Sequence, residues 1–174
     1  EMEQSVRYML SSGSNQLSLS FPGISAIQAR RVMESALSIV KSFCEQSYNS
    51  VSCSYNSAGK VTLTFSAMGL TPEQTASCRT SALESAVAVH DQLWADGILT
   101  KSMTDTEKAR VYFDWICGSC DYNYKDLENP LSHIPYGLFA EGLAVCDGYT
   151  GAYNLLLKLE GIDCYALSNG GHIW

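Results

Sequence analysis

The sequence predicts an α+β protein of two domains, residues 1–100 and residues 101–174. Two observations indicate this class. In the first domain, segments that alternate apolar and polar residues are followed by segments with apolar residues at helical spacing. In the second domain, a helix-capping pattern and an apolar helix that begins at a cysteine follow a break at residues 97–103. A length of 174 residues fits one domain or two small ones.

The first unit predicted in the N-terminal domain is a hairpin followed by a helix. Residues 5–9 and 17–21 alternate apolar and polar side chains on either side of a polar turn, which is the period of half-buried strands. A helix is predicted over about residues 25–44, where apolar side chains recur at helical spacing.

The second unit has the same order. Residues 50–55 and 61–65 alternate in the same way and flank a turn that ends at Gly59. A helix follows over about residues 71–94, with Pro72 at a first-turn position. The two units together predict a ββα-ββα domain, in which two helices cover one face of a four-stranded antiparallel sheet. No residue pattern in this domain suggests catalysis.

The predicted C-terminal domain begins with a helix. Thr104 and Glu107 form a capping-box pattern, in which each side chain satisfies a free backbone N–H group at the helix start. A further helix is predicted from near Cys146 to Glu160, and a short strand over residues 162–167.

Composition excludes several classes of protein. Apolar residues make up 46% and charged residues 17%, which is ordinary for a globular chain. A net charge of -7 without a basic cluster argues against a nucleic-acid partner. No apolar run approaches the roughly 18 residues that a membrane span needs. No pattern suggests calcium or an organic cofactor, so no cofactor is expected.

Several features bear on the location of the protein. Few lysines and many serines, tyrosines and asparagines favour an exported protein, extracellular or at the cell surface. The chain begins at Glu1 without a leader, so we expect its native N-terminus to lie upstream. Seven cysteines leave at least one thiol free or bridged to another chain. In an exported protein, a disulfide could form among Cys44, Cys53 and Cys78, and its connectivity stays open.

Two cysteines compete for the role of nucleophile, and the first is Cys120. The run Cys117-Gly118-Ser119-Cys120 resembles part of a papain-type signature, but Asp121 stands where that signature has an aromatic residue. Too few residues follow for the papain-type histidine, which lies about 130 positions downstream. Cys120 also ends a predicted helix, where the negative end of the dipole disfavours a thiolate. We therefore expect Cys120 to be structural.

Cys146 has the opposite setting, because it begins a predicted helix. The positive end of the helix dipole and the unpaired N–H groups there stabilise a thiolate. The same N–H groups can hold the oxyanion that forms when a thiolate attacks an acyl carbon. Asp147 would oppose this effect if it faced the thiol, so we expect its side chain to point away.

A histidine is placed to serve this cysteine. His172 follows Cys146 after one predicted helix and one predicted strand, which can return the chain to the start of the helix. It could accept the thiol proton and later donate it to the leaving group. His90 lies within a predicted helix and is expected to be structural, and His133 is a weaker candidate for the rim of the site.

The region around Cys146 and His172 resembles the core of bacterial transglutaminase-like proteins. The shared pattern is a Cys-x-Gly-Tyr helix start, a leucine-rich helix, Gly-Ile, a strand and then His-x-Trp. The resemblance covers about residues 104–174. It rests on Tyr136, Glu141-Gly142-Leu143-Ala144-Val145-Cys146-Asp147-Gly148-Tyr149, Ala152-Tyr153, Leu155-Leu156-Leu157, Gly161-Ile162-Asp163-Cys164 and His172-Ile173-Trp174.

The resemblance implies a papain-like α+β core with a Cys-His-Asp triad, in which Cys146 is the nucleophile and His172 the base. The family's aspartate lies on the strand after the His-x-Trp motif, and neither Asp147 nor Asp163 matches it. We therefore expect this chain to be a truncated core, cut before the aspartate. Without that orienting residue, activity is expected to fall by orders of magnitude.

The leading hypothesis is acyl transfer or hydrolysis on protein or peptide amides through a Cys146 thioester. Tyr136, Tyr149 and Trp174 are expected to contact the substrate. Water as the acceptor gives a peptidase or amidase, and an amine gives crosslinking. The sequence does not indicate an oligomeric state.

Two alternatives stay open. One is a non-catalytic surface or secreted binding module with a degenerate site, because a fold does not fix a function. The other is a zinc protein built on Cys117 and Cys120, with His133 or Cys146 as a further ligand, although no second close cysteine pair follows.

Overall fold

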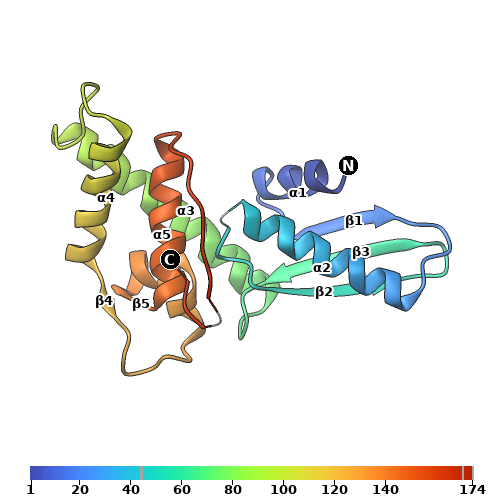
Figure 1. Cartoon of the computed structure of the whole chain (residues 1–174). Coiled ribbons are helices and arrows are strands. Elements are labelled where there is room, and N and C mark those ends of the chain that lie inside the picture. The colour runs from blue at the N-terminus through green and yellow to red at the C-terminus, as the bar shows by residue number, and fades with distance from the viewer. Residues whose placement is uncertain (44, 170, 174) are drawn as a thin grey trace. The chain divides into compact units, whose positions relative to one another are not determined.

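The computed structural model describes residues 1–43, 45–169 and 171–173. Cys44 and Trp174, both named above, therefore lie outside the described residues. The chain divides into two compact units, Glu1–Ser77 and Cys78–Trp174, and helix α3, Pro72–Ala95, contains the point of division (Figure 1). A boundary of the domains at residue 100 stays a prediction.

The sheet of the N-terminal unit contains β1, Gln16–Ser20, β2, Ser50–Tyr55, and β3, Lys60–Ser66. It is antiparallel, with β3 between the two other strands. The β2–β3 hairpin predicted from residues 50–65 is therefore confirmed. Alternate residues of β3 are buried, and its register places Leu63 opposite Leu17 of β1 and Cys53 of β2, so one face of the sheet is apolar.

Two helices bury that apolar face, α1, Met2–Ser11, and α2, Ala26–Ser42. The helix predicted over residues 25–44 is thus confirmed, with Ser25 and Gln28 forming a capping box at its start. The core contains side chains from both helices, from the sheet and, with Tyr48, from the segment before β2: Val6, Met9, Leu17, Ala36, Val40, Tyr48, Val61, Leu63 and Phe65.

The strand predicted at residues 5–9 is wrong, since this segment lies within α1. Helical spacing places Val6 and Met9 on one face, and both are buried. A strand would have paired Val6 with Tyr8 on the buried face, whereas Tyr8 is 75% exposed. The described residues of the N-terminal unit therefore form a sheet of three strands instead of four, and the predicted repeat of two ββα units is wrong.

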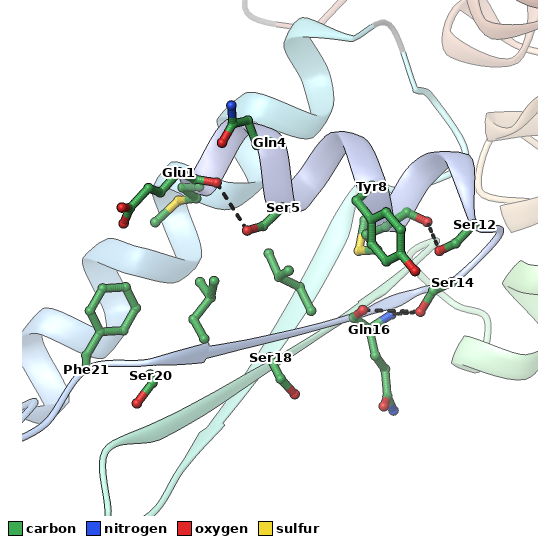
Figure 2. Close-up of a pocket in the computed structure, with 14 residues that line it drawn as sticks. Glu1, Gln4, Ser5, Tyr8, Ser12, Ser14, Gln16, Ser18, Ser20 and Phe21 are labelled. Atoms are coloured by element: carbon green, nitrogen blue, oxygen red, sulfur yellow. Dashed lines mark hydrogen bonds between the residues drawn. The ribbon is translucent and has the colours of Figure 1, made fainter.

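A groove of about 920 Å³ lies between α1 and β1 (Figure 2). Figure 2 shows serines of both elements around it, with Ser14 bonded to the backbone of Gln16. Phe21 and Tyr8 contribute aromatic rings to its wall. The described residues that line the groove include no cysteine or histidine.

The C-terminal unit packs α4, Asp105–Ser119, and α5, Cys146–Leu159, with the latter part of α3. The capping box of Thr104 and Glu107 is present, as predicted. The buried members of this core are Ala86, Leu93, Leu99, Tyr112, Ile116, Cys120, Leu138, Ala144, Ala152, Leu156 and Leu157. None of the helices in the described part of the chain is long and apolar enough to span a membrane.

The connection from α4 to α5 folds into short elements that lead to Cys146. It contains β4, Asp121–Tyr122, the 3₁₀ turn η1, Pro130–His133, the π-helical turn η2, Gly137–Glu141, and β5, Leu143–Ala144. Strands β4 and β5 pair in parallel. After α5, the strand predicted over residues 162–167 is absent as a regular strand, and a single bridge joins Ser168 to Ile173.

Candidate active site

Cys146 is the first residue of α5, as the sequence predicted. Strand β5 leads directly into this helix through Val145, whose backbone N–H donates to the Ser132 carbonyl at 2.9 Å. The Val145 side chain provides no capping hydrogen bond. The first N–H groups of α5 therefore face the site without a capping side chain, and the helix dipole adds a positive potential there.

A cavity of about 260 Å³ at this helix start contains both predicted catalytic residues. Its lining consists of Tyr122, Cys146, Tyr149, Thr150, His172 and Ile173. The Thr150 hydroxyl donates to the Cys146 carbonyl at 2.8 Å and lies 3.4 Å from the Ile173 carbonyl. This second contact joins the segment that carries His172 to α5.

Tyr122, whose sequence region resembles the family's approach to the site, lines this cavity. Burial raises the pKa of Tyr122, and the Cys146 thiol raises it further, whereas a hydrogen bond from the Cys146 backbone N–H lowers it. Tyr122 and Cys146 therefore lie close together in the cavity that both line. Pairing of β4 with β5 fixes this position, because Tyr122 lies opposite Ala144, two residues before Cys146. The Tyr122 hydroxyl is thereby a candidate for a second hydrogen-bond donor to an oxygen bound at the helix start.

The three residues predicted to contact substrate have different settings. Tyr149 lines the Cys146 cavity, stacks on Tyr122 with ring centroids 6.1 Å apart, and donates its hydroxyl to the Cys120 carbonyl at 2.7 Å. Tyr136 precedes η2 and is not among the residues that line this cavity. Trp174 lies outside the described residues. Contact of these residues with substrate stays a prediction.

Asp147 is bound by His133, so its charge is directed to the η1 turn. The two carboxylate oxygens lie 3.0 Å and 2.9 Å from His133 Nδ1, and Nε2 of the same ring lies 2.8 Å from the Leu127 carbonyl. Both neighbours are acceptors, so this arrangement favours the protonated imidazole, in which both ring nitrogens are donors. Burial alone would lower the pKa of His133, but the hydrogen bonds to Asp147 and Leu127 and the charge of Asp147 raise it overall.

The ion pair of His133 and Asp147 predicts a pH dependence of folding. Because folding raises the pKa of His133, its contribution is complete below the ordinary value of about 6.5 and is lost as pH rises through the folded value. In urea unfolding, the parent protein should be less stable at about pH 8.5 than at about pH 6. His133→Asn should lack this difference in stability. Equal losses in the parent and in His133→Asn would contradict this linkage.

The second cysteine candidate has the structural setting that the sequence predicted. Cys120 ends α4 and is 8% exposed, and burial raises the pKa of its thiol. Neighbouring Cys117 is exposed. Cys53 and Cys78 are free thiols in this structure. Within residues 1–43, 45–169 and 171–173, no three histidine, cysteine or acidic side chains form a potential metal site, so Cys117 and Cys120 lack a third ligand there.

Comparison with known proteins agrees with this geometry. Residues 92–169 match the model of the transglutaminase-like superfamily. The match includes Cys146 and Tyr122, and His172 lies just beyond it. The sequence matches none of the curated proteins with which it was compared. The family whose model matches residues 92–169 is therefore the one that the motifs around Cys146 predicted.

Proposed function

We propose that this protein transfers or hydrolyses acyl groups of protein or peptide amides through a thioester on Cys146. The observation that carries the proposal is the single cavity that contains Cys146, His172 and Tyr122 at the uncapped start of α5. The match of residues 92–169 to the superfamily model supports it, because such domains are typically papain-like cysteine enzymes.

The first half of the proposed reaction forms the thioester. His172 accepts the proton of the Cys146 thiol, and the resulting thiolate attacks the carbonyl carbon of the amide. The carbonyl oxygen becomes an oxyanion, which accepts hydrogen bonds from the Cys146 N–H and the Tyr122 hydroxyl. When the intermediate collapses, the C–N bond breaks, and His172 returns its proton to the departing amine.

The second half releases the acyl group. A water molecule or a primary amine attacks the thioester, and His172 accepts the proton of this nucleophile. The C–S bond then breaks, and the proton passes from His172 to the Cys146 sulfur, which regenerates the thiol. Water gives a carboxylic acid and an amine gives a new amide, so hydrolysis and crosslinking differ only in the acceptor.

Alkylation with iodoacetamide tests the proposed pair of Cys146 and His172. Exposed Cys117 provides an internal reference in the same chain. It lies near the C-terminal end of α4, whereas Cys146 lies at the N-terminal end of α5. Peptide mass spectrometry at about pH 7 should find Cys146 labelled at least about tenfold faster than Cys117, because only the thiolate reacts. In His172→Ala, the Cys146 rate should fall and the Cys117 rate should stay unchanged.

Comparable rates at Cys146 and Cys117 that do not respond to His172→Ala would contradict the proposal. Such a result would favour a non-catalytic binding module on a transglutaminase-like fold. A change of both rates in His172→Ala would indicate altered folding, so circular dichroism of the variant is the necessary control.

A further inference from the structure

Asn123 is a buried polar residue beside the Cys146 site, and the proposed reaction gives it no chemical step. It directly follows β4, which carries Tyr122, and it is 5% exposed. A buried amide destabilises a fold unless its polar atoms have hydrogen-bond partners. The partners of Asn123 therefore indicate which parts of the site this side chain connects.

Three hydrogen bonds join Asn123 to its surroundings. Its backbone N–H donates to the Ala144 carbonyl of β5 at 2.9 Å. Its side-chain Nδ2 donates to the Ser132 hydroxyl at 2.9 Å, and its Oδ1 accepts from the Asp126 N–H at 3.2 Å. The Asn123 side chain thus joins the end of β4 to the η1 turn.

Ser132 in turn contacts the start of α5. It is fully buried in η1, and its carbonyl accepts the Val145 N–H at 2.9 Å, directly before Cys146. A Cβ atom at Gly148 would lie 2.3 Å from the same carbonyl, so the first turn of α5 packs closely against Ser132. The side chain of Asn123 therefore connects β4 to the helix start that carries Cys146.

This connection supplements a short strand pairing. β4 and β5 contain two residues each, and their parallel pairing places Tyr122 opposite Ala144. A ladder of this length provides few hydrogen bonds. The bond from Asn123 to Ser132 adds a second link between the backbone of Tyr122 and the start of α5, and it is buried, where water competes little with it.

We propose that Asn123 is a positioning residue, which holds the Tyr122 hydroxyl at the start of α5 through its hydrogen bond with Ser132. The inference rests on the proposed function, in which this hydroxyl donates to the oxyanion. An oxyanion donor is effective only at about 2.7–3.1 Å from the oxygen that it stabilises. A displacement of about 1 Å therefore slows acylation, whereas a reaction of the thiolate that forms no oxyanion does not depend on this donor.

Two reagents separate stabilisation of the oxyanion from activation of the thiolate. With p-nitrophenyl acetate, the Cys146 thiolate attacks the ester carbonyl carbon, an oxyanion forms, and the C–O bond breaks as p-nitrophenolate leaves. With iodoacetamide, the same thiolate displaces iodide from a saturated carbon, and no oxyanion forms. The rate of acylation, after subtraction of the rate in Cys146→Ala, is divided by the rate of alkylation. This ratio measures the stabilisation of the oxyanion.

Asn123→Ala should lower the ratio of acylation to alkylation about tenfold, because the Tyr122 hydroxyl loses its position while the thiolate is retained. Tyr122→Phe should lower the ratio at least as much, since it removes the hydroxyl. The two substitutions together should lower the ratio no further than Tyr122→Phe alone, because Asn123 acts through Tyr122.

Two further variants distinguish positioning from stability. Asn123→Asp should keep a ratio close to that of the parent, because a carboxylate oxygen can accept a hydrogen bond from the Ser132 hydroxyl. Its melting temperature should nevertheless fall, because a charge is buried. Asn154→Leu is the matched control, and its ratio should equal that of the parent. Asn154 is 3% exposed in the same unit, and its Nδ2 has no partner among the residues that the structure describes.

A ratio in Asn123→Ala equal to that of the parent would overturn the inference, even if both rates or the melting temperature fell. A tenfold loss that Asn123→Ala adds to Tyr122→Phe would also overturn it. In either case, acylation of the parent that depends on Cys146 would leave the proposed function intact. A parent protein that reacts with p-nitrophenyl acetate no faster than Cys146→Ala would instead reject the proposed function, and the inference with it.

Discussion

Gly148→Ala is expected to lower the free energy of unfolding of the C-terminal unit by about 3 kcal/mol. Gly148 is buried in the first turn of α5, and a Cβ atom there would lie 2.3 Å from the Ser132 carbonyl and 3.2 Å from the Ile134 carbonyl. Both contacts are with backbone, so the helix start must move away from the η1 turn. Since Cys146 lies in the same turn, its rapid alkylation should be lost as well.

Gly118→Ala is the matched control for this substitution. Gly118 is also helical, in α4, and a Cβ atom at this position would have no neighbour within 4 Å. Alanine is a better helix former than glycine by up to about 1 kcal/mol, so this variant should be slightly more stable than the parent. Urea unfolding of both variants would measure the difference. Similar stabilities would show that the contact of Gly148 with the η1 turn does not fix the start of α5.

Elements with local signals were predictable from the sequence. Capping residues and helical spacing located α2 and α4, and alternation located the β2–β3 hairpin. Cys146 was predictable as a helix start because an apolar helical pattern begins there. His172 was a candidate because one predicted helix and one predicted strand separate it from Cys146, which can bring the two residues together. The structure places both residues in one cavity.

The secondary-structure predictions were wrong where both the strand period and the helix period fit the same residues, and where contacts with distant residues determine the structure. Residues 5–9 satisfy both alternation and helical spacing, and burial of Met9 together with Val6 favours the helix. Residues 162–167 have strand-like residues but no neighbouring strand among the described residues with which to pair. The position of Tyr122 in the site depends on the pairing of β4 with β5, and these two-residue strands have no recognisable pattern in the sequence. Export of the protein stays a prediction, because no observation tests it.

A buried carboxylate that no motif indicated stabilises the C-terminal unit. The Glu160 side chain is 5% exposed and lies at the end of α5. It accepts hydrogen bonds from Trp94 Nε1 at 2.6 Å, from Lys108 Nζ at 2.6 Å and from the Tyr112 hydroxyl at 3.0 Å. His90 Nε2 lies 3.1 Å from the same carboxylate, which agrees with the structural role predicted for His90. Glu160 therefore joins α3, α4 and α5 within this unit.

Glu160→Gln is expected to lower the free energy of unfolding by about 3 kcal/mol, since it removes one partner of a buried ion pair. The amide nitrogen that replaces one carboxylate oxygen is itself a donor, and the groups around it are donors as well, so it would lack an acceptor. The exposed pair of Arg110 and Asp114 provides the control, because Asp114→Asn makes the same charge change on side chains that are 72% and 55% exposed. That variant should lose no more than about 0.5 kcal/mol. Equal losses in urea unfolding would contradict the role assigned to Glu160.

The same carboxylate is expected to contribute to the loss of stability in acid. Burial alone would raise the pKa of Glu160, but the hydrogen bonds from Lys108, Trp94 and Tyr112 and the charge of Lys108 lower it overall. A lowered pKa stabilises the fold above the ordinary value of about 4.3, and this contribution is lost as pH falls through the folded value. The parent should therefore lose stability over this acid range, whereas Glu160→Gln, already weaker at neutral pH, should lose less. If acid sensitivity were unchanged in Glu160→Gln, other carboxylates would have to account for it.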